Sequence, residues 1–205
     1  MARGGPTDDT IEMSERGGHG GSGGFGLLRA LIALASVSGL LAFVGSPAAS
    51  TSAVATSKVL RIDHVADGDT VDLTNGAKVR LVQIDTPEVY FHPECYGRHA
   101  SALTKRMLPP GTVVRLTREP ATDSVDSYGR LLRYLIRGRD GLNINVRLVA
   151  VGAAAPYFYR GRRGRYAAKL ARLALRARER HLGLWGQCPG TPYNPDEGVS
   201  TGPPR

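Results

Sequence analysis

Five short segments rich in β-branched residues constrain the fold of this 205-residue chain more than any other feature. Each is four to six residues long and is bounded by turn-forming residues, which is the pattern of β-strands joined by tight turns. The predicted strands are Val59–Ile62, Thr70–Leu73, Val79–Ile84, Thr112–Leu116 and Leu131–Ile136.

Three helices are predicted after the third and fifth strands. The first ends at Pro109-Pro110-Gly111, which cannot continue a helix, and the last places apolar residues on a single stripe. Because the strands are clustered early, we predict an α+β fold, a five-stranded OB-type β-barrel with about three α-helices. The predicted helices run from about Arg98 to Leu108, from Asn143 or Asn145 to about Gly152, and from about Arg165 to Leu182.

Residues 1–55 are predicted to be a leader that precedes the barrel domain. Their apolar run is short for a membrane span, and it is followed by small residues of the kind that a signal peptidase cleaves. We therefore expect a signal peptide over about residues 13–55, cleaved after Ala48 or Ala55, and a secreted or extracytoplasmic protein. A membrane anchor is the alternative. The start codon is left open between the first methionine and Met13.

Residues 56–188 are predicted to form the folded domain, and the Pro/Gly-rich residues 189–205 a disordered tail. The chain has two cysteines, Cys95 and Cys188, and in an exported protein a disulfide between them is favoured over free thiols. A metal site built on the two cysteines is expected less than a disulfide. The disulfide would tie the tail to the loop that carries Glu88.

The charge is strongly basic. The chain has a net charge of +9. The leader contributes −1, because it contains three arginines and four acidic residues, so the exported part has a net charge of +10. Such a charge attracts polyanions, of which nucleic acid is the commonest. Solubility or adhesion to an acidic surface would explain the same charge.

The turn at Asn75-Gly76 predicts a β-hairpin, and hydrophobicity selects its register. A three-residue loop over residues 75–77 would pair Leu73 with Val79 and keep the apolar residues on one face. Asp69 would then lie opposite Gln83, with Asp85 next on the same face. Two carboxylates this close repel each other unless a cation binds, and oxygen donors without His or Cys favour Ca²⁺.

Arg80 does not fit a straight strand. It lies five residues before Asp85, so in a regular strand the two side chains point to opposite faces. If both serve one site, the strand must bend at the barrel rim or end before Asp85.

Several motifs follow one another at characteristic spacing. They are Asp67-Gly-Asp-Thr-Val71, the run Arg80-Leu-Val-Gln-Ile-Asp-Thr-Pro-Glu88, Tyr96-Gly97, Tyr128-Gly-Arg130 and Leu184-Trp185. In this order they make the chain from about Val59 to Trp185 resemble the thermonucleases, the staphylococcal-nuclease-like family.

That resemblance implies a Ca²⁺-dependent nuclease on an OB barrel, which cuts DNA and RNA with little sequence preference and leaves 3′-phosphate ends. It implies that carboxylates and one backbone carbonyl bind Ca²⁺, that Glu88 is the general base, and that two arginines hold the phosphate. The implied site residues are Asp69, Asp85 and Thr86 for the metal, Arg80, Glu88 and Arg130 for catalysis, and Tyr128, Tyr157 and Tyr159 for the substrate.

This chain also departs from the family pattern. Ser127 replaces a family lysine that contacts phosphate, and the basic stretch Arg160–Arg165 is a candidate to compensate. An OB module that binds nucleic acid without cutting it is the alternative, but it would lack the catalytic residues Arg80, Glu88 and Arg130, all of which are present. No protein partner is implied, and we expect a monomer.

Overall fold

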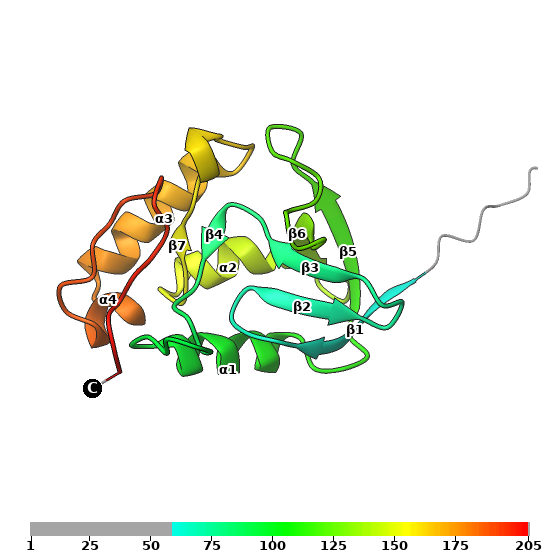
Figure 1. Cartoon of the computed structure of the whole chain (residues 1–205), viewed down its shortest axis with the longest axis horizontal. Helices are drawn as coiled ribbons and strands as arrows, with labels where there is room; N and C mark the ends of the chain where they lie inside the picture. Colours follow the sequence, from blue (N-terminus) through cyan, green and yellow to red (C-terminus); the bar gives the residue numbers. More distant parts are fainter. Residues whose placement is uncertain (1–58, 205) are drawn as a thin grey trace, which may run out of the picture. The chain divides into compact units, whose positions relative to one another are not determined.

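The computed structural model describes residues 59–204, in which five strands close into a barrel (Figure 1). Neighbouring strands follow the order β1-β2-β3-β6-β5, and β5 returns to pair with β1. Among the strand pairs of this barrel, only β3–β6 is parallel. The predicted α+β, OB-type barrel is therefore confirmed. The barrel strands are β1 Leu60–Val65, β2 Thr70–Leu73, β3 Lys78–Leu81, β5 Val113–Arg118 and β6 Leu131–Arg137.

The three predicted helices are present within a few residues of their expected bounds. Asn143 caps the second of them, because its side chain accepts a hydrogen bond from Val146 N at 3.1 Å. On the third, Leu170 and Ala177 are buried, as the apolar stripe predicts. The further elements are a short helix, a two-stranded sheet and a 3₁₀ turn. The bounds are α1 Gly97–Met107, α2 Ile144–Ala150, α3 Ala167–Glu179, α4 Leu184–Gln187, β4 Ile84–Asp85, β7 Ala155–Pro156 and η1 Tyr159–Gly161.

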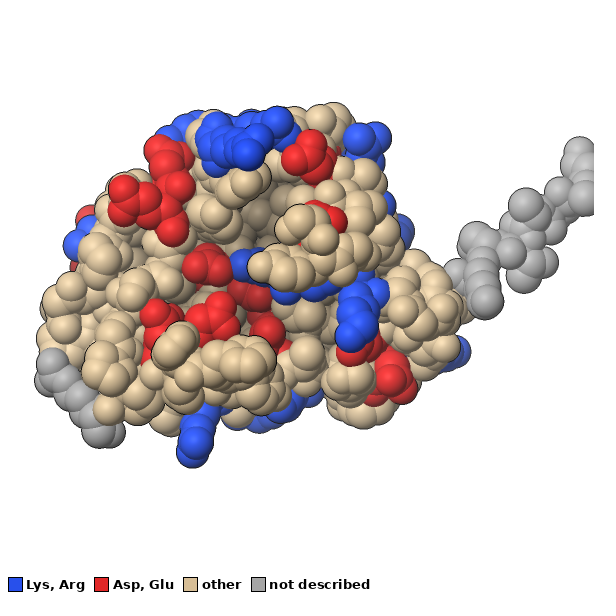
Figure 2. All heavy atoms as spheres, in the orientation of Figure 1, with Lys and Arg blue, Asp and Glu red and all other residues tan. Residues whose placement is uncertain are grey.

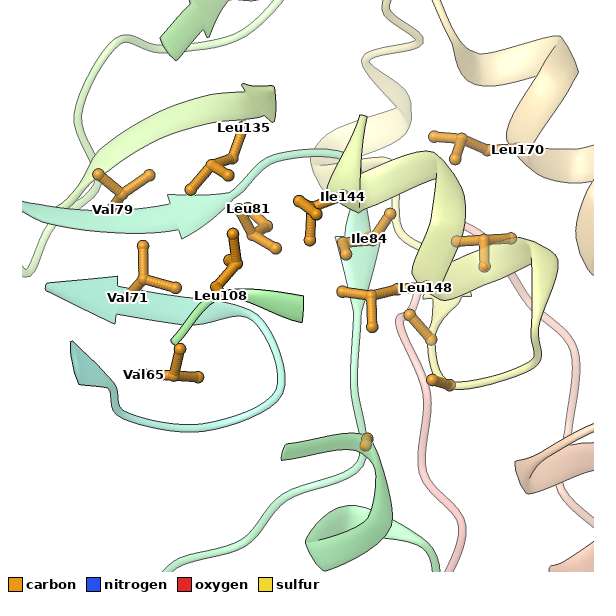
Figure 3. Close-up of a cluster of buried hydrophobic side chains, with 14 of the residues drawn as sticks. Val65, Val71, Val79, Leu81, Ile84, Leu108, Leu135, Ile144, Leu148 and Leu170 are labelled. Atoms are coloured by element: carbon orange, nitrogen blue, oxygen red, sulfur yellow. The ribbon is translucent and has the colours of Figure 1, made fainter. Parts of the chain in front are cut away.

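The larger of two apolar clusters in residues 59–204 joins the barrel to the helices (Figure 3). Val71, Val79 and Leu81 of the barrel hairpin are buried together with Leu148 of α2 and Leu170 of α3. Each fully buried aliphatic side chain of this kind contributes about 1.5–3 kcal/mol from removal of apolar surface from water. The hairpin that carries the acidic residues is thus fixed on a rigid support.

The predicted strand Val79–Ile84 is divided in two, which corrects the sequence interpretation. β3 ends at Leu81, and β4 begins at Ile84 after a turn in which Gln83 has the left-handed φ of 66°. The buried Gln83 amide compensates for this conformation: its Nε2 donates to Arg162 O at 2.6 Å and its Oε1 accepts from Gly164 N at 2.8 Å. The break supplies the bend that Arg80 requires.

The hairpin register also differs from the prediction. Val71 pairs with Val79, not with Leu81, and the three-residue loop covers residues 74–76, not 75–77. The reason lies in Gly76, whose φ of 84° places it at the third loop position, where a three-residue hairpin needs a left-handed residue. The same side chains face the core in both registers. The observed register, however, places Asp69 opposite Leu81 and not opposite Gln83.

Residues 189–204, predicted to be disordered, run back over the domain (red in Figure 1). Phe158 N donates to Pro195 O at 2.6 Å, and Cys95 N donates to Gly202 O at 2.7 Å. Composition did not reveal this order, because it comes from backbone hydrogen bonds and from one covalent anchor. We call residues 189–204 the C-terminal strap.

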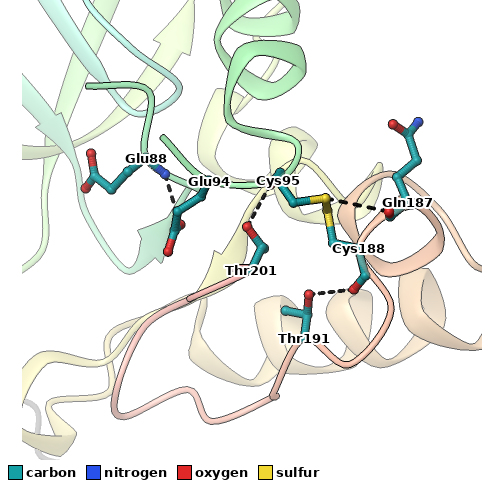
Figure 4. The surroundings of a disulfide bond; sticks show 7 residues. All are labelled: Glu88, Glu94, Cys95, Gln187, Cys188, Thr191 and Thr201. Atoms are coloured by element: carbon teal, nitrogen blue, oxygen red, sulfur yellow. Dashed lines mark hydrogen bonds between the residues drawn. A yellow bond between two sulfur atoms is a disulfide. The ribbon is translucent and has the colours of Figure 1, made fainter. Parts of the chain in front are cut away.

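The covalent anchor is a disulfide between Cys95 and Cys188, as predicted (Figure 4). The two residues are 93 positions apart, so the bond restricts the unfolded chain and contributes about 4–5 kcal/mol by loop-closure entropy. It joins the segment before α1 to the start of the C-terminal strap.

The predicted leader, signal peptide and start codon fall in residues 1–58, outside the part of the chain that the structure describes. Within residues 59–204, no helix has both the length and the apolar character that a membrane crossing needs.

Glu119 is a buried carboxylate that gives a first testable prediction. Its pKa lies below the usual range: burial alone would raise it, but N–H donors from Arg165 and Ala121, at 2.8 and 3.1 Å, outweigh that effect. Tyr134 Oη also donates to it, at 3.2 Å. We expect Glu119→Gln to lower the free energy of unfolding by about 1–3 kcal/mol at neutral pH.

The pH dependence follows from the direction of that shift. Because the folded-state pKa is lowered, the stabilisation is complete above the ordinary glutamate pKa of about 4.3 and is lost as the pH falls further. Denaturant unfolding at pH 7 and pH 3 measures this difference. Glu179→Gln, on the exposed side of α3, is the control and should change stability by less than about 0.5 kcal/mol. Equal stability of Glu119→Gln and the parent at pH 7 would contradict the prediction.

Candidate active site

The acidic loop between β1 and β2 is held in a tight conformation. Asp67 Oδ1 accepts hydrogen bonds from Asp69 N at 3.0 Å and Thr70 N at 2.7 Å, so Asp67 supports the loop. Gly68 packs so closely that a Cβ at this position would lie 2.4 Å from Thr86 Oγ1. Only glycine lets the loop approach Thr86 in this way, and the approach delivers Asp69 to the start of β4.

Asp69 is buried and bonded on both carboxylate oxygens. Its Oδ2 accepts from Thr86 N at 2.9 Å and from Thr86 Oγ1 at 3.0 Å. Its Oδ1 forms an ion pair with Arg80 Nε at 3.1 Å. Asp69 thus bonds directly to Thr86, the residue after Asp85, and the predicted opposition of Asp69 and Gln83 does not produce this contact.

Arg80 bridges the break between β3 and β4. Its Nη1 donates to the carbonyls of Leu81 and Ile84, both at 2.8 Å, and its Nη2 donates to Asp85 Oδ1 at 2.7 Å. Arg80 therefore reaches Asp85 because the strand ends before it, which is one of the two conditions expected from the sequence. One guanidinium holds the two predicted metal ligands, Asp69 and Asp85, together.

Several carboxylates surround Arg80, so negative charge is in excess around it. Burial raises the pKa of Asp69 to about 7; Asp67 and Asp85 add to the rise, and Arg80 opposes it. Burial would lower the pKa of Arg80, but the surrounding carboxylates outweigh it and raise that pKa. Figure 2 shows acidic side chains gathered in the hollow at the middle of this face, with basic side chains along its upper rim. Four carboxylates (Asp67, Asp69, Asp85 and Glu88) act on a single arginine here.

These donors suit a hard cation. Asp69, Asp85 and the Thr86 carbonyl offer oxygen atoms only, the type that Ca²⁺ prefers, and the excess of carboxylates would be offset by a divalent charge. Within residues 59–204, no three His, Cys, Asp or Glu side chains converge with metal-binding geometry. A cation here would therefore depend on two carboxylates, a backbone carbonyl and water.

Glu88 lies close enough to Asp67, Asp85 and Arg80 to feel their charges, but its carboxylate is not bonded to any of them. Burial raises the pKa of Glu88, Asp67 and Asp85 raise it further, and Arg80 lowers it. Its backbone N–H donates to Glu94 Oε2 at 3.0 Å, whereas its carboxylate has no hydrogen-bond partner among residues 59–204 (Figure 4). A Cβ on Gly97 would lie 2.2 Å from Glu88 O, so the start of α1 fixes the backbone of Glu88. The carboxylate is free to bind water.

Arg130 reaches the site from the loop before β6. Asp126 orients it: Asp126 Oδ2 accepts from Arg130 Nε at 2.7 Å, and Asp126 Oδ1 accepts from Arg130 N at 2.9 Å. Arg130 Nη1 donates to Thr70 Oγ1 at 3.3 Å, and Thr70 Oγ1 donates to Asp69 Oδ1 at the same distance. A chain of contacts thus links Arg130 to the acidic group, while Arg130 Nη2 has no partner in the described residues.

A cavity of about 520 Å³ has both arginines in its wall. The three predicted tyrosines also line it: Tyr128 and Tyr159 are exposed, and Tyr157 lies edge-on to Tyr159 at 6.2 Å. Exposed rings beside arginines offer stacking surfaces for bases without sequence readout. Glu88 does not line this cavity.

The basic stretch Arg160–Arg165 divides into paired and unpaired residues. Arg162 pairs with Asp123, Arg163 with Asp196 and Arg165 with Glu119. Arg160 forms no ion pair in the described residues; it lies over the Tyr159 ring at 5.1 Å and lines the same cavity as Ser127. Of the four, Arg160 is the one placed to take over a phosphate contact.

Sequence reasoning missed several positioning groups. Asp126 lies two residues before the motif Tyr128-Gly-Arg130, and its spacing of four from Arg130 could have identified it. Gln83, which stabilises the break before Asp85, gave no such signal, because its partners lie about 80 positions away. The backbone N–H of Val199, which donates to Asp85 Oδ2 at 2.9 Å, gave none either.

Asp126→Asn provides a second prediction. An amide presents only one acceptor oxygen, so it loses either the backbone or the side-chain bond to Arg130. Since burial would raise the pKa of Asp126 but the Arg130 N–H donors lower it, the charged form is the one bound. We expect kcat of the reaction at this site to fall about tenfold, the cost of one weakened charge-assisted bond. Steady-state kinetics measures this change in kcat.

The control is Asp123→Asn, which alters the partner of Arg162 in the same loop. An equal loss in both variants would contradict a specific role for Asp126.

Several known proteins are similar in sequence to this chain. "Endonuclease YhcR" of Bacillus subtilis (strain 168) is 37% identical over 109 residues, 47% of this chain, and the chain spans only 9% of that relative's length. An "Uncharacterized endonuclease" of Escherichia coli O157:H7 is 32% identical over 135 residues, 64% of this chain and 80% of the relative. The "Thermonuclease" of Staphylococcus intermedius is 31% identical over 130 residues, 60% of this chain and 74% of the relative.

The family model described as "Staphylococcal nuclease homologue" matches residues 78–187, which is more than half of the chain. This segment holds Arg80, Asp85, Glu88 and Arg130; Asp69 lies before it, and the C-terminal strap lies after it. The family model matches more than half of the chain, and the chain covers most of the length of the Escherichia coli and Staphylococcus intermedius relatives. The chain therefore belongs to the staphylococcal nuclease homologue family.

Proposed function

We propose that this protein is an exported, Ca²⁺-dependent nuclease that hydrolyses DNA and RNA with little sequence preference and leaves 3′-phosphate ends. The observation that carries the proposal is the pair of arginines, Arg80 and Arg130, in the wall of one cavity, with Asp69 and Asp85 bonded to the first of them. Relatives named endonuclease and thermonuclease support the same activity, and the disulfide supports export, since such bonds persist in oxidising compartments.

The residues divide the chemistry among them. A phosphodiester is an anion, so attack on phosphorus needs donors that stabilise charge on its equatorial oxygens, and Arg130 Nη2 is a donor without a protein partner in the described region. Glu88 takes a proton from a water molecule whose oxygen bonds to phosphorus. The bond from phosphorus to the 5′ oxygen breaks, the leaving oxygen takes a proton from solvent, and the phosphate stays on the 3′ side.

Asp69, Asp85 and the Thr86 carbonyl would hold Ca²⁺, which when bound supplies positive charge beside the phosphate and orients water. Arg80 keeps the two carboxylates together and prevents them from separating by mutual repulsion. Tyr128, Tyr157 and Tyr159 line the space in which a nucleotide would lie.

Digestion of plasmid DNA, single-stranded DNA and RNA by the purified chain tests this function. We expect cleavage of all three with Ca²⁺ and none after chelation, and we expect product ends that a polymerase extends only after phosphatase treatment. N-terminal sequencing of protein recovered outside the cell tests export. Cleavage of no substrate with Ca²⁺, Mg²⁺ or Mn²⁺, together with retained DNA binding, would instead support the non-catalytic binding module.

A further inference from the structure

The C-terminal strap, residues 189–204, lies against the acidic group of the candidate site. Val199 N donates to Asp85 Oδ2 at 2.9 Å, and Arg80 Nη2 donates to the other oxygen, Oδ1, at 2.7 Å. The Asp85 carboxylate is therefore held from two sides, by β3 through Arg80 and by the strap through Val199. An Asp held at both oxygens cannot rotate freely.

The adjacent residue, Gly198, brings the strap close to Asp85. Gly198 has a φ of 85°, and a Cβ at this position would lie 2.7 Å from Asp85 Oδ2. Both the left-handed backbone and the missing side chain are needed to aim Val199 N–H at the carboxylate. The Val199 side chain itself is buried beside Cys95, Cys188 and Trp185, which fixes this part of the strap.

The strap is fastened on both sides of Val199. Before it, the disulfide Cys95–Cys188 anchors its start and Asp196 pairs with Arg163 at 3.2 Å. After it, Thr201 Oγ1 donates to Cys95 O at 2.7 Å, as Figure 4 shows. Cys95 therefore holds both the beginning and the end of the strap, and it lies seven positions after Glu88.

We propose that the C-terminal strap is a positioning element of the active site: its Val199 N–H fixes the Asp85 carboxylate in the orientation that binds the cation. This inference rests on the proposed function for the role of the cation. The family match ends at Gln187, so the strap is a feature that this chain adds to the matched segment. The disulfide makes the positioning dependent on oxidation, because reduction frees the start of the strap.

Val199→Pro is the direct test, since proline removes the N–H and keeps an apolar side chain. Loss of a bond to a charged group should raise the Kd for Ca²⁺, measured by calorimetry on the full chain, by about tenfold to a hundredfold. Gly198→Ala should act in the same direction, because its Cβ would meet Asp85 Oδ2. Ser200→Ala, an exposed neighbour on the strap, is the matched control and should bind Ca²⁺ like the parent.

Two further measurements are needed. One distinguishes the positioning of Asp85 by Val199 from a general effect on protein stability, and the other tests the Val199–Asp85 contact independently of the proposed function. Val199→Ala keeps the N–H but loses buried surface, so it should lower the melting temperature with a smaller effect on Kd than Val199→Pro. In ¹⁵N-labelled protein, Asp85→Asn should shift the Val199 amide proton, a readout that needs neither metal nor activity.

The reduced protein, or the double variant Cys95→Ser with Cys188→Ser, should bind Ca²⁺ more weakly and lose the sensitivity to Val199→Pro. A Val199 amide that does not respond to Asp85→Asn, or parental Ca²⁺ affinity in Val199→Pro, would overturn the proposal. If the parent binds no Ca²⁺ and cuts nothing, the proposed function fails, and a responsive Val199 amide would still establish the contact with Asp85 while excluding its role in cation binding.

Discussion

Replacement of Arg130 by lysine is expected to lower kcat for DNA cleavage by about 10³-fold, the loss typical for a donor to a charged transition state. Arg130 uses Nε for Asp126 and Nη1 for Thr70, which leaves Nη2 for the phosphate. A lysine has a single ammonium group at the end of a flexible chain, so it cannot hold Asp126 and reach the phosphate together. Steady-state kinetics on a defined oligonucleotide measures the change.

The control for this prediction is Arg133→Lys, in the strand β6 that follows Arg130. The Arg133 guanidinium is also bonded, to Ser124 O at 2.8 Å and Ser124 Oγ at 3.0 Å, but the residue does not line the cavity. A similar loss of activity in both variants would mean that disturbance of β6 is responsible. Wild-type turnover by Arg130→Lys would exclude Arg130 from the reaction.

The two arginines are not equivalent in this structure. Arg80 is tied to two carboxylates and two carbonyls and is largely buried, whereas Arg130 keeps one nitrogen without a protein partner in the described region. Loss of Arg80 would leave the buried Asp69 and the partly buried Asp85 without their ionic partner, and removing one member of a buried ion pair costs about 3–5 kcal/mol in other proteins. Activity loss on substitution of Arg80 therefore has to be compared with the stability of the variant.

Local patterns predicted the barrel well, because strand and helix propensities agree with the fold. β2 begins and ends where its β-branched residues indicate, and Asn143 caps α2 as its position suggests. The side of the hairpin that faces the core was also predictable, since apolar residues must be buried. The loop position was not, because it depends on whether Gly76 occupies the second or the third loop position.

The features that complete the site depend on distant residues. Gln83 breaks the strand because its amide is bonded to Arg162 and Gly164, and nothing near Gln83 in the sequence indicates this. The C-terminal strap reads as a disordered tail, because its Pro/Gly composition resembles that of unfolded segments and its order comes from contacts with Cys95, Phe158 and Asp85. The candidate site residues could be named from their motifs, whereas Gln83 and Val199, which act on the site from distant positions, could not.

Glu88→Gln is expected to lower kcat by about 10²–10⁴-fold, the range for loss of a general base. Glutamine has the same shape but cannot accept the proton from water. The Glu88 carboxylate has no hydrogen-bond partner among residues 59–204, so the substitution breaks no contact described there and the melting temperature should stay close to that of the parent. KM for DNA should change little, because the arginines and tyrosines of the cavity are untouched.

Glu94→Gln separates water activation from loop geometry. Glu94 Oε2 accepts from Glu88 N at 3.0 Å, so its variant disturbs the backbone of Glu88 and leaves the Glu88 carboxylate intact. We expect a loss of about tenfold or less, since a single hydrogen bond to a charged group is weakened. Equal losses in the two variants would show that Glu88 contributes through loop geometry. Parental kcat in Glu88→Gln would assign water activation to another group, and a large fall in its melting temperature would mark the effect as structural.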